Sequence, residues 1–196
     1  MSIKTYAQAA REAIEEEMRR DPMVWALGED LGRGGVFGQY AGLSACFGPE
    51  RICDTPISEA SIMGAAVGAK LAAPDKLVVA AIGDGSYYFG NPAAAHYCAR
   101  ACDAPVLYII LDNSAWGAVR RAVRDMYPDG RAVRSNDMPL TSLEPMVAFD
   151  KACEAAGGYG ERVEDPVELP KALERAKHAV TVEKRQALLH VVLAGA

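Results

Sequence analysis

The sequence predicts an α/β protein of three layers, in which helices cover both faces of a mainly parallel sheet of about six strands. Segments with the periodicity of amphipathic helices alternate with short strand-like segments along the 196 residues. The strand-like segments are apolar on both faces, as in "LVVAAI" (77–82) and "VLYIIL" (106–111). Such runs are typical of buried parallel strands. We therefore expect one domain spanning residues 1–196.

The chain should begin with a helix that ends near Pro22. Its apolar face consists of residues at four-residue spacing: Tyr6, Ala10, Ile14 and Met18. A buried strand is expected at 23–27, and a short strand at 51–53 follows a glycine-rich loop.

Ser58 is a suitable N-cap for the next helix, which should reach about Leu71. One face of this helix carries only small residues: Ala60, Gly64, Gly68 and Ala72. A face without large side chains allows another backbone to approach closely.

In the remaining chain, an Asn91-Pro92 pair should open a helix that runs to about Cys102. The sequence "GAVRRAVRDMY" has a helical pattern, and "PDGRAVRSNDMPLTS" has the composition of a loop. The further elements are expected as a helix at 145–156, a strand at 159–163, a helix at 170–184 and a strand at 187–194.

Composition limits the function and the compartment. Hydrophobic residues make up 51% of the chain and charged residues 24%, with a net charge of −5. This balance gives no reason to expect nucleic acid or a membrane as a partner. Arginines cluster between 120 and 134, but interleaved aspartates favour a solvated face over a subsite for an anionic substrate. The start of the chain lacks a signal-peptide core, so we expect a cytoplasmic protein.

Cysteines and histidines suggest neither a zinc site nor a disulfide framework. The five cysteines contain no Cys-x-x-Cys pair and are interpreted as small buried thiols. The three histidines are widely spaced. His190 lies within the apolar run "ALLHVVLA" and is interpreted as a core residue rather than a base.

Three predicted strands end in polar residues: Glu59, Asp84 and Asn113. Ligands of open parallel sheets bind at the carboxyl ends of strands. A carboxylate and an amide oxygen together suit Mg²⁺, and a Gly-Asp-Gly turn lets backbone N–H groups approach phosphate. Tyr88 stands where a dinucleotide fingerprint needs glycine, and the chain contains no Gly-Lys-Ser/Thr P-loop.

The second half resembles a known family. Gly83-Asp84-Gly85, followed after residues 86–111 by Asp112-Asn113, is similar to the Gly-Asp-Gly…Asn-Asn signature of thiamine diphosphate-dependent enzymes. Residues 72–196 look most like the diphosphate-binding domain of acetolactate synthase and the simple 2-oxo acid decarboxylases. The resemblance implies the thiamine diphosphate-binding, flavodoxin-like topology.

The resemblance also implies a metal and cofactor site. Asp84, Asn113 and the carbonyl of Ala115 would hold Mg²⁺ on the diphosphate. Gly83, Gly85 and Ser86 would line the phosphates, with N–H groups from Gly85 and Ser86. Asp112 departs from the signature, which has asparagine there, and the added negative charge is expected to tune affinity rather than abolish binding.

The first half resembles a different member of the same superfamily. "REAIEEEMRRDPMVWALGEDLG" and "FGPERICDTPISEASIMGAAVGA" are similar to the β subunit of the 2-oxo acid dehydrogenase decarboxylating component, which supplies a pyrimidine-binding domain. The resemblance implies that Glu59 binds the cofactor's aminopyrimidine and acts as the catalytic acid/base. The alternative is an acid that only favours the first turn of its helix. Glu29 either joins a proton path or is an ordinary loop acid.

The two resemblances meet between residues 71 and 72. Residues 1–71 look like half of a pyrimidine domain, and residues 72–196 look like half of a diphosphate domain, so we suspect an engineered or recombined hybrid. The missing half of the diphosphate domain would supply a bulky apolar residue that supports the bent cofactor. Ile57, Ile62 and Met63 are candidates to replace it.

Two hypotheses about the function follow from the resemblance, and a third is unrelated to it. The first is a thiamine diphosphate- and Mg²⁺-dependent decarboxylase or carboligase acting on 2-oxo acids, with the cofactor bound across a homodimer interface. The second is a scaffold that keeps the fold, and perhaps the cofactor, without turnover. The third is a flavodoxin-like nucleotide- or phosphate-binding module in which Asp84 coordinates metal alone.

Overall fold

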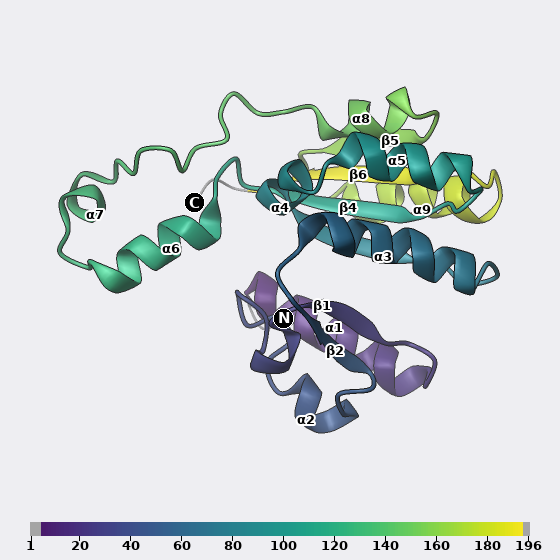
Figure 1. Ribbon diagram of the computed structural model, residues 1–196, viewed down its shortest axis with the longest axis horizontal. Coiled ribbons are helices and arrows are strands. Elements are labelled where there is room, and N and C mark those ends of the chain that lie inside the picture. Colours follow the sequence, from purple (N-terminus) through teal and green to yellow (C-terminus); the bar gives the residue numbers. More distant parts are fainter. Residues whose placement is uncertain (1–4, 194–196) are drawn as a thin grey trace. The chain divides into compact units, whose positions relative to one another are not determined.

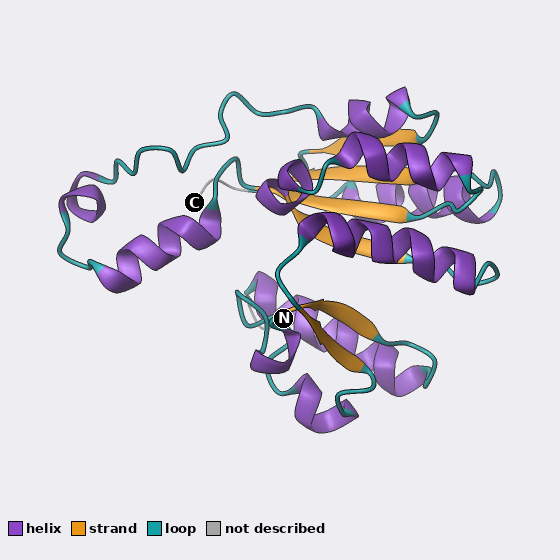
Figure 2. Ribbon diagram, viewed as in Figure 1, coloured by secondary structure: helices purple, strands orange, loops and turns teal. Residues whose placement is uncertain are grey.

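The computed structural model describes residues 5–193. The chain divides into two compact units, residues 1–58 and residues 59–196. Figures 1 and 2 show the helices and strands of each unit.

The first unit is a small parallel α/β unit. Its elements are α1 (Tyr6–Arg20), β1 (Ala26–Glu29), the 3-10 helix η1 (Leu31–Arg33), α2 (Leu43–Phe47) and β2 (Ile52–Thr55). Strands β1 and β2 pair in parallel, and the core consists of Met18, Leu31, Leu43 and Ile52. The Arg51 guanidinium donates to the carbonyls of Met18, Asp21 and Val24, which ties the end of α1 to β2.

The second unit is built on a four-stranded parallel sheet with the strand order β3-β4-β6-β5. Its strands are β3 (Val79–Gly83), β4 (Leu107–Asp112), β5 (Tyr159–Val163) and β6 (Ala187–Val192). Its helices are α3 (Glu59–Ala72), α4 (Asp84–Phe89), α5 (Pro92–Ala101), α6 (Gly117–Met126), α7 (Arg131–Ser135), α8 (Phe149–Ala155) and α9 (Leu169–Thr181).

Alternation along the strands produces three layers in this unit. Even-numbered residues of β4, such as Tyr108 and Ile110, pack against side chains of α3, α4 and α8. Odd-numbered residues, such as Leu107, pack on the other face with α9. Figure 2 shows these helices around the orange strands. The predicted α/β class with parallel strands is confirmed, and the six strands lie in sheets of two and four.

The boundary between the units falls before α3. Met63 and Val67 of α3 are buried in clusters with residues of the second unit, so this helix belongs to it. The division of a single domain into halves at residues 71 and 72 stays a prediction.

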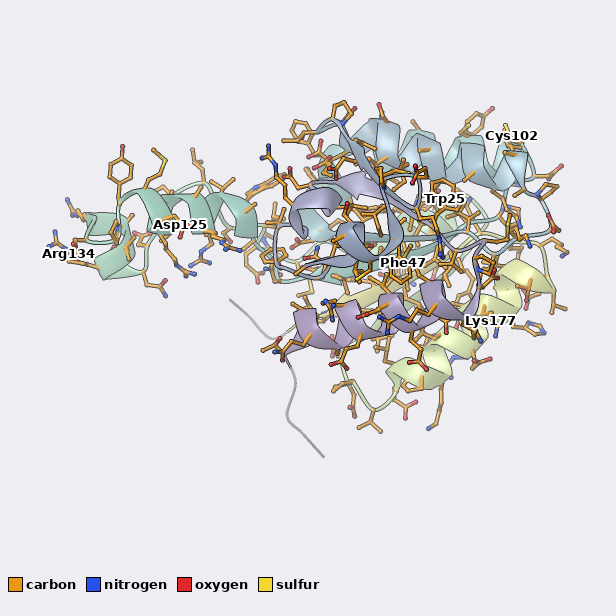
Figure 3. All side chains as sticks on the ribbon, turned by 90° about the horizontal axis from the view of Figure 1, so that it is seen from below. Trp25, Phe47, Cys102, Asp125, Arg134 and Lys177 are labelled. Atoms are coloured by element: carbon orange, nitrogen blue, oxygen red, sulfur yellow. The ribbon has the colours of Figure 1, made fainter. Side chains whose placement is uncertain are left out.

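Two segments differ from the sequence-based expectation. The expected Gly-Asp-Gly turn is the start of a short helix, because Asp84 and Gly85 lie in the first turn of α4. The expected loop after residue 127 contains α7. Neither α6 nor α7 has a buried residue, and Figure 3 shows Asp125 and Arg134 on these helices. This exposure agrees with a solvated arginine face.

All five cysteines are free thiols. Cys153 is buried in the core, but Cys46, Cys98 and Cys102 are exposed, so the expectation of buried thiols is wrong for these three. Cys102 follows the last turn of α5, where Figure 3 labels it at the surface. Within residues 5–193, no helix is both long enough and apolar enough to cross a bilayer.

Candidate functional site

The sheet brings Asp84 and the Asp112-Asn113 pair to the same edge. Strands β3 and β4 run in parallel, with Gly83 opposite Leu111. The residues that follow these positions therefore leave the sheet side by side. This register brings the acid after one strand and the amide after the next close together.

Two of the predicted metal ligands converge on one backbone N–H group. The amide of Ala115 donates to Asp84 Oδ2 at 3.2 Å and to Asn113 Oδ1 at 3.2 Å. Both oxygens therefore face the same small volume, as oxygen ligands of a single divalent ion must. The carbonyl of Ala115 already accepts a hydrogen bond from the N–H of Gly117 at 2.7 Å and has a second lone pair to offer.

The loop that carries these groups is fixed on both sides. Trp116 donates its N–H to the carbonyl of Thr141 at 2.9 Å, and Leu143 donates to the carbonyl of Ser114 at 2.8 Å. A Cβ atom placed on Gly85 would lie 2.7 Å from Cε3 of the Trp116 ring. Glycine is therefore needed at this position because the indole packs directly against the backbone.

Asp112 is buried, and both of its carboxylate oxygens accept hydrogen bonds. Its Oδ1 accepts from the N–H of Ser114 at 2.7 Å and from the Ser114 hydroxyl at 3.3 Å. Its Oδ2 accepts from His190 Nε2 at 2.6 Å. The residue that departs from the family signature is thus fully engaged.

The pKa values of the buried Asp84 and Asp112 carboxyls are shifted in opposite directions. Burial raises the pKa of Asp84 to about 6, reinforced by hydrogen bonding to Asp112 and repulsion from it and opposed by the N–H groups of Gly85 and Ala115. Burial also acts to raise the pKa of Asp112, but hydrogen bonds from His190, Ser114 and Asp84 outweigh it and hold that pKa below its ordinary value. Asp112 is therefore the ionised partner, and a shared proton resides on Asp84.

This shift predicts a pH-dependent stability of the metal-free protein. Between its ordinary pKa of 3.8 and about 6, Asp84 retains a proton in the folded state that the unfolded chain has released. Stability therefore falls as pH rises through this range, by up to about 3 kcal/mol. Asp84→Asn should lack this loss. Its unfolding free energy should therefore rise relative to that of wild type between pH 4 and pH 7. Urea unfolding with a chelator measures both. A difference that does not change with pH would contradict the assignment.

The donor set suits magnesium held jointly with phosphate. A carboxylate, an amide oxygen and a carbonyl are hard oxygen ligands, and Mg²⁺ takes few protein ligands when phosphate oxygens complete its shell. Within residues 5–193, no three His, Cys, Asp or Glu side chains cluster as a metal site. The predicted set needs no such cluster because only one of its members is a carboxylate.

The backbone N–H groups in the first turn of α4 differ in whether they are already hydrogen-bonded. The N–H of Gly85 donates to Asp84 Oδ1 at 2.9 Å, so it is already engaged. Ser86 is in the same turn, where helical N–H groups have no intrahelical acceptor. Gly83 is the last residue of β3 and adopts an extended conformation.

Glu59 is the first residue of α3 and is half-buried. Helix α3 contacts α4, which begins at Asp84. Glu29 ends β1 in the other unit, and its Oε1 accepts from the N–H of Ser58 at 3.1 Å. Glu29 therefore has a structural hydrogen-bond partner within the first unit.

The three candidates for an apolar cofactor support differ in burial. Met63 is fully buried in the core and has no free surface for a ligand. Ile57 is 75% exposed and Ile62 is half-buried. Only these two retain surface to offer.

Sequence reasoning missed the contact between His190 and Asp112. The interpretation of His190 as a buried core residue is confirmed, but its bond to Asp112 was not foreseen. The pair forms because β6 lies next to β4, with His190 opposite Ile110. No local pattern marks this contact, since 78 positions separate the two residues.

Comparison with known families identifies the second unit. The family described as "Thiamine pyrophosphate enzyme, C-terminal TPP binding domain" matches residues 60–191. This segment is more than half of the chain and includes both predicted metal-binding side chains. The chain belongs to this thiamine pyrophosphate enzyme family.

Curated relatives of the chain are β subunits of 2-oxo acid dehydrogenases. It is 50% identical over 72 residues to the 2-oxoisovalerate dehydrogenase subunit beta of Bacillus subtilis (strain 168), covering 36% of this chain and 22% of that protein. It is 45% identical over 69 residues to the pyruvate dehydrogenase E1 component subunit beta of Acholeplasma laidlawii, covering 35% and 21%. The matched part is thus roughly a fifth of each relative's length.

Solved structures share the fold. The thiamine diphosphate-dependent 4-hydroxybenzoylformate decarboxylase of Rhodococcus jostii RHA1 aligns with a TM-score of 0.60 and 21% identity, covering 95% of this chain and 32% of that one. The benzoylformate decarboxylase of Polynucleobacter necessarius aligns with a TM-score of 0.62 and 18% identity, covering 98% and 34%. At these identities the likeness shows the fold alone.

Proposed function

We propose that this member of the thiamine pyrophosphate enzyme family is a thiamine diphosphate- and Mg²⁺-dependent decarboxylase or carboligase acting on 2-oxo acids. The observation that carries the proposal is the convergence of Asp84 Oδ2 and Asn113 Oδ1 on one N–H group at the end of the sheet. The family match includes both residues. Relatives named for 2-oxo acid dehydrogenases support the substrate class.

Each residue has a separate task in this proposal. Asp84, Asn113 and the Ala115 carbonyl hold Mg²⁺, and the first turn of α4, with Gly83, Gly85 and Ser86, receives the diphosphate. Glu59 holds and moves a proton at the aminopyrimidine ring nitrogen. The bound cofactor supplies the nucleophilic carbon and the electron sink for decarboxylation.

We further propose that the site is shared between two copies of the chain. In the family that the residues resemble, different domains hold the pyrimidine and the diphosphate, so one copy offers only one side of each. The small residues along α3 are exposed, and a Cβ placed on Gly64 or Gly68 would meet nothing within 4 Å. This open face suits close packing of a second backbone in a two-fold dimer, with Glu59 of each chain facing Asp84 of the other.

The shared site predicts complementation between two inactive variants. Glu59→Ala and Asp84→Ala should each fail to activate the cofactor alone. Random exchange makes about half of the dimers mixed, and one of their two sites keeps both residues, so about a quarter of wild-type activation should return. Proton exchange at the cofactor's reactive carbon measures it. A mixture that stays inactive while tagged subunits exchange would rule out the shared site.

The hybrid origin also remains a proposal. The family match begins at residue 60, whereas curated relatives over 72 residues are β subunits of 2-oxo acid dehydrogenases. A chain that joins a pyrimidine-domain half to a diphosphate-domain half would match both kinds of protein.

Turnover separates the enzyme from a scaffold that only binds. Release of CO₂ from pyruvate, 3-methyl-2-oxobutanoate and benzoylformate, with thiamine diphosphate and Mg²⁺ present, tests the enzyme directly. CO₂ release above that of Asp84→Ala supports the decarboxylase. Cofactor binding without CO₂ release from any 2-oxo acid supports the scaffold, which the loss of half of each parental domain would explain.

A further inference from the structure

We propose that His190 is a positioning residue for the metal site, acting through Asp112. It fixes the Asp112 carboxylate, which in turn holds the Ser114 turn that presents Asn113 and Ala115. This inference rests on the proposed function for its consequence in metal binding. That His190 fixes Asp112 and the Ser114 turn does not depend on any bound metal or cofactor.

The first observation is the environment of the pair. His190 and Asp112 are both almost wholly buried, and their Nε2 and Oδ2 atoms lie 2.6 Å apart. In this contact the carboxylate oxygen accepts and Nε2 carries the hydrogen. A buried charge that loses its donor is costly, so the histidine is matched to the aspartate and not only to the cavity.

The second observation is that the other oxygen of Asp112 holds the turn at Ser114. Oδ1 accepts from both the N–H and the hydroxyl of Ser114. Ser114 has a left-handed φ of 55°, a conformation that non-glycine residues rarely adopt. The carboxylate therefore stabilises a strained turn between Asn113 and Ala115, the two metal-binding positions on this loop.

The third observation is that the ring is held from its other side. Phe149 meets the His190 ring edge to face, with centroids 5.2 Å apart. His190 Nδ1 lies 3.7 Å from Asp150 Oδ1, and neither atom has a hydrogen-bond partner among the described residues. Asp150 Oδ2 faces Lys151 Nζ at 3.4 Å. Packing against Phe149 thus helps to fix the ring plane, with Nε2 directed at Asp112.

Asp112 stands where the family signature has asparagine, and this difference explains why a buried histidine contacts it. An asparagine at position 112 would be neutral and would carry its own donors, so it would need no buried histidine. Aspartate there requires a donor that hydrogen-bonds its carboxylate and fixes its rotamer. We therefore expect the contribution of His190 to depend on Asp112, which is a coupling that double-mutant analysis measures.

The experiment uses four variants of the full chain: His190→Leu, Asp112→Asn, the two combined, and His96→Leu as the matched control. His96 is equally buried, but it bonds Tyr87 at 2.6 Å and Gln186 at 2.7 Å instead of the site. Two quantities are measured. The first is amide hydrogen exchange of Ser114 and Ala115 in metal-free protein, and the second is the Mg²⁺ concentration that half-saturates thiamine diphosphate binding.

His190→Leu should speed exchange at both amides about tenfold or more and raise the half-saturating Mg²⁺ concentration by about 10- to 100-fold, as for other residues that orient metal ligands. In the Asp112→Asn background the same substitution should change either quantity less than about threefold. His96→Leu should lower stability and leave both unchanged. His190→Gln, which keeps a donor, should recover part of the loss.

Equal effects of His190→Leu in both backgrounds, or local effects no larger than those of His96→Leu, would overturn the inference. If His190→Leu does not fold, folding of the double variant supports the coupling, and failure of both contradicts it. If wild type binds no thiamine diphosphate, the proposed function fails. Amide exchange at Ser114 and Ala115 still decides the role of His190.

Discussion

Asp84→Ala is expected to abolish the thermal stabilisation that thiamine diphosphate gives in the presence of Mg²⁺. A ligand at 100 times its Kd stabilises the folded state by about 2.7 kcal/mol. For a chain of this size that corresponds to a rise in Tm of about 5–10 °C. The variant removes the only carboxylate of the predicted ligand set, so the diphosphate loses its metal anchor.

Wild type should show this rise only with Mg²⁺ present, because the metal joins the cofactor to the protein. Asp129→Ala is the matched control, since Asp129 is an exposed aspartate between α6 and α7. It should behave as wild type. A stabilisation of equal size with a chelator present, or one that survives in Asp84→Ala, would contradict the proposed metal site.

Glu59→Gln is expected to leave thiamine diphosphate binding nearly intact while slowing proton exchange at the cofactor's reactive carbon by about 10²- to 10⁴-fold. Glutamine keeps the size and one hydrogen-bonding oxygen but cannot hold or release the proton. The diphosphate and its metal supply most of the binding, so affinity should change little.

Nuclear magnetic resonance of the exchanging proton in deuterated buffer measures this rate. Glu174→Gln, at an exposed position of α9, is the control and should exchange at the wild-type rate. If Glu59→Gln exchanges as fast as wild type, Glu59 does no more than favour the first turn of α3.

The fold was largely predictable because its signals are local. Apolar runs such as 106–111 and helix-opening residues such as Asn91-Pro92 depend on neighbours in the chain, and strand β4 and helix α5 form close to their predicted positions. The site edge was predictable as well. Parallel strands bring their carboxyl ends together, so polar residues after β3 and β4 had to meet.

Contacts between distant segments were not predictable in the same way. Gly-Asp-Gly has the local pattern of a turn, yet Asp84 and Gly85 form the first turn of α4, where Gly85 packs against the distant Trp116. The bond between His190 and Asp112 depends on β6 lying between β4 and β5. Strand order is a property of the whole sheet, and no short sequence pattern specifies which strand becomes the neighbour of β4.

Asp84, Asn113 and Ala115 are together proposed to form a metal-dependent thiamine diphosphate site. Isothermal titration of the purified chain with thiamine diphosphate, with Mg²⁺ and then with a chelator, tests it most directly, with ADP titrated in parallel. We expect saturable binding of thiamine diphosphate with Mg²⁺, loss of that binding with the chelator, and no comparable binding of ADP. Preference for ADP would instead indicate a nucleotide-binding module, and absence of thiamine diphosphate binding with Mg²⁺ present would contradict the claim.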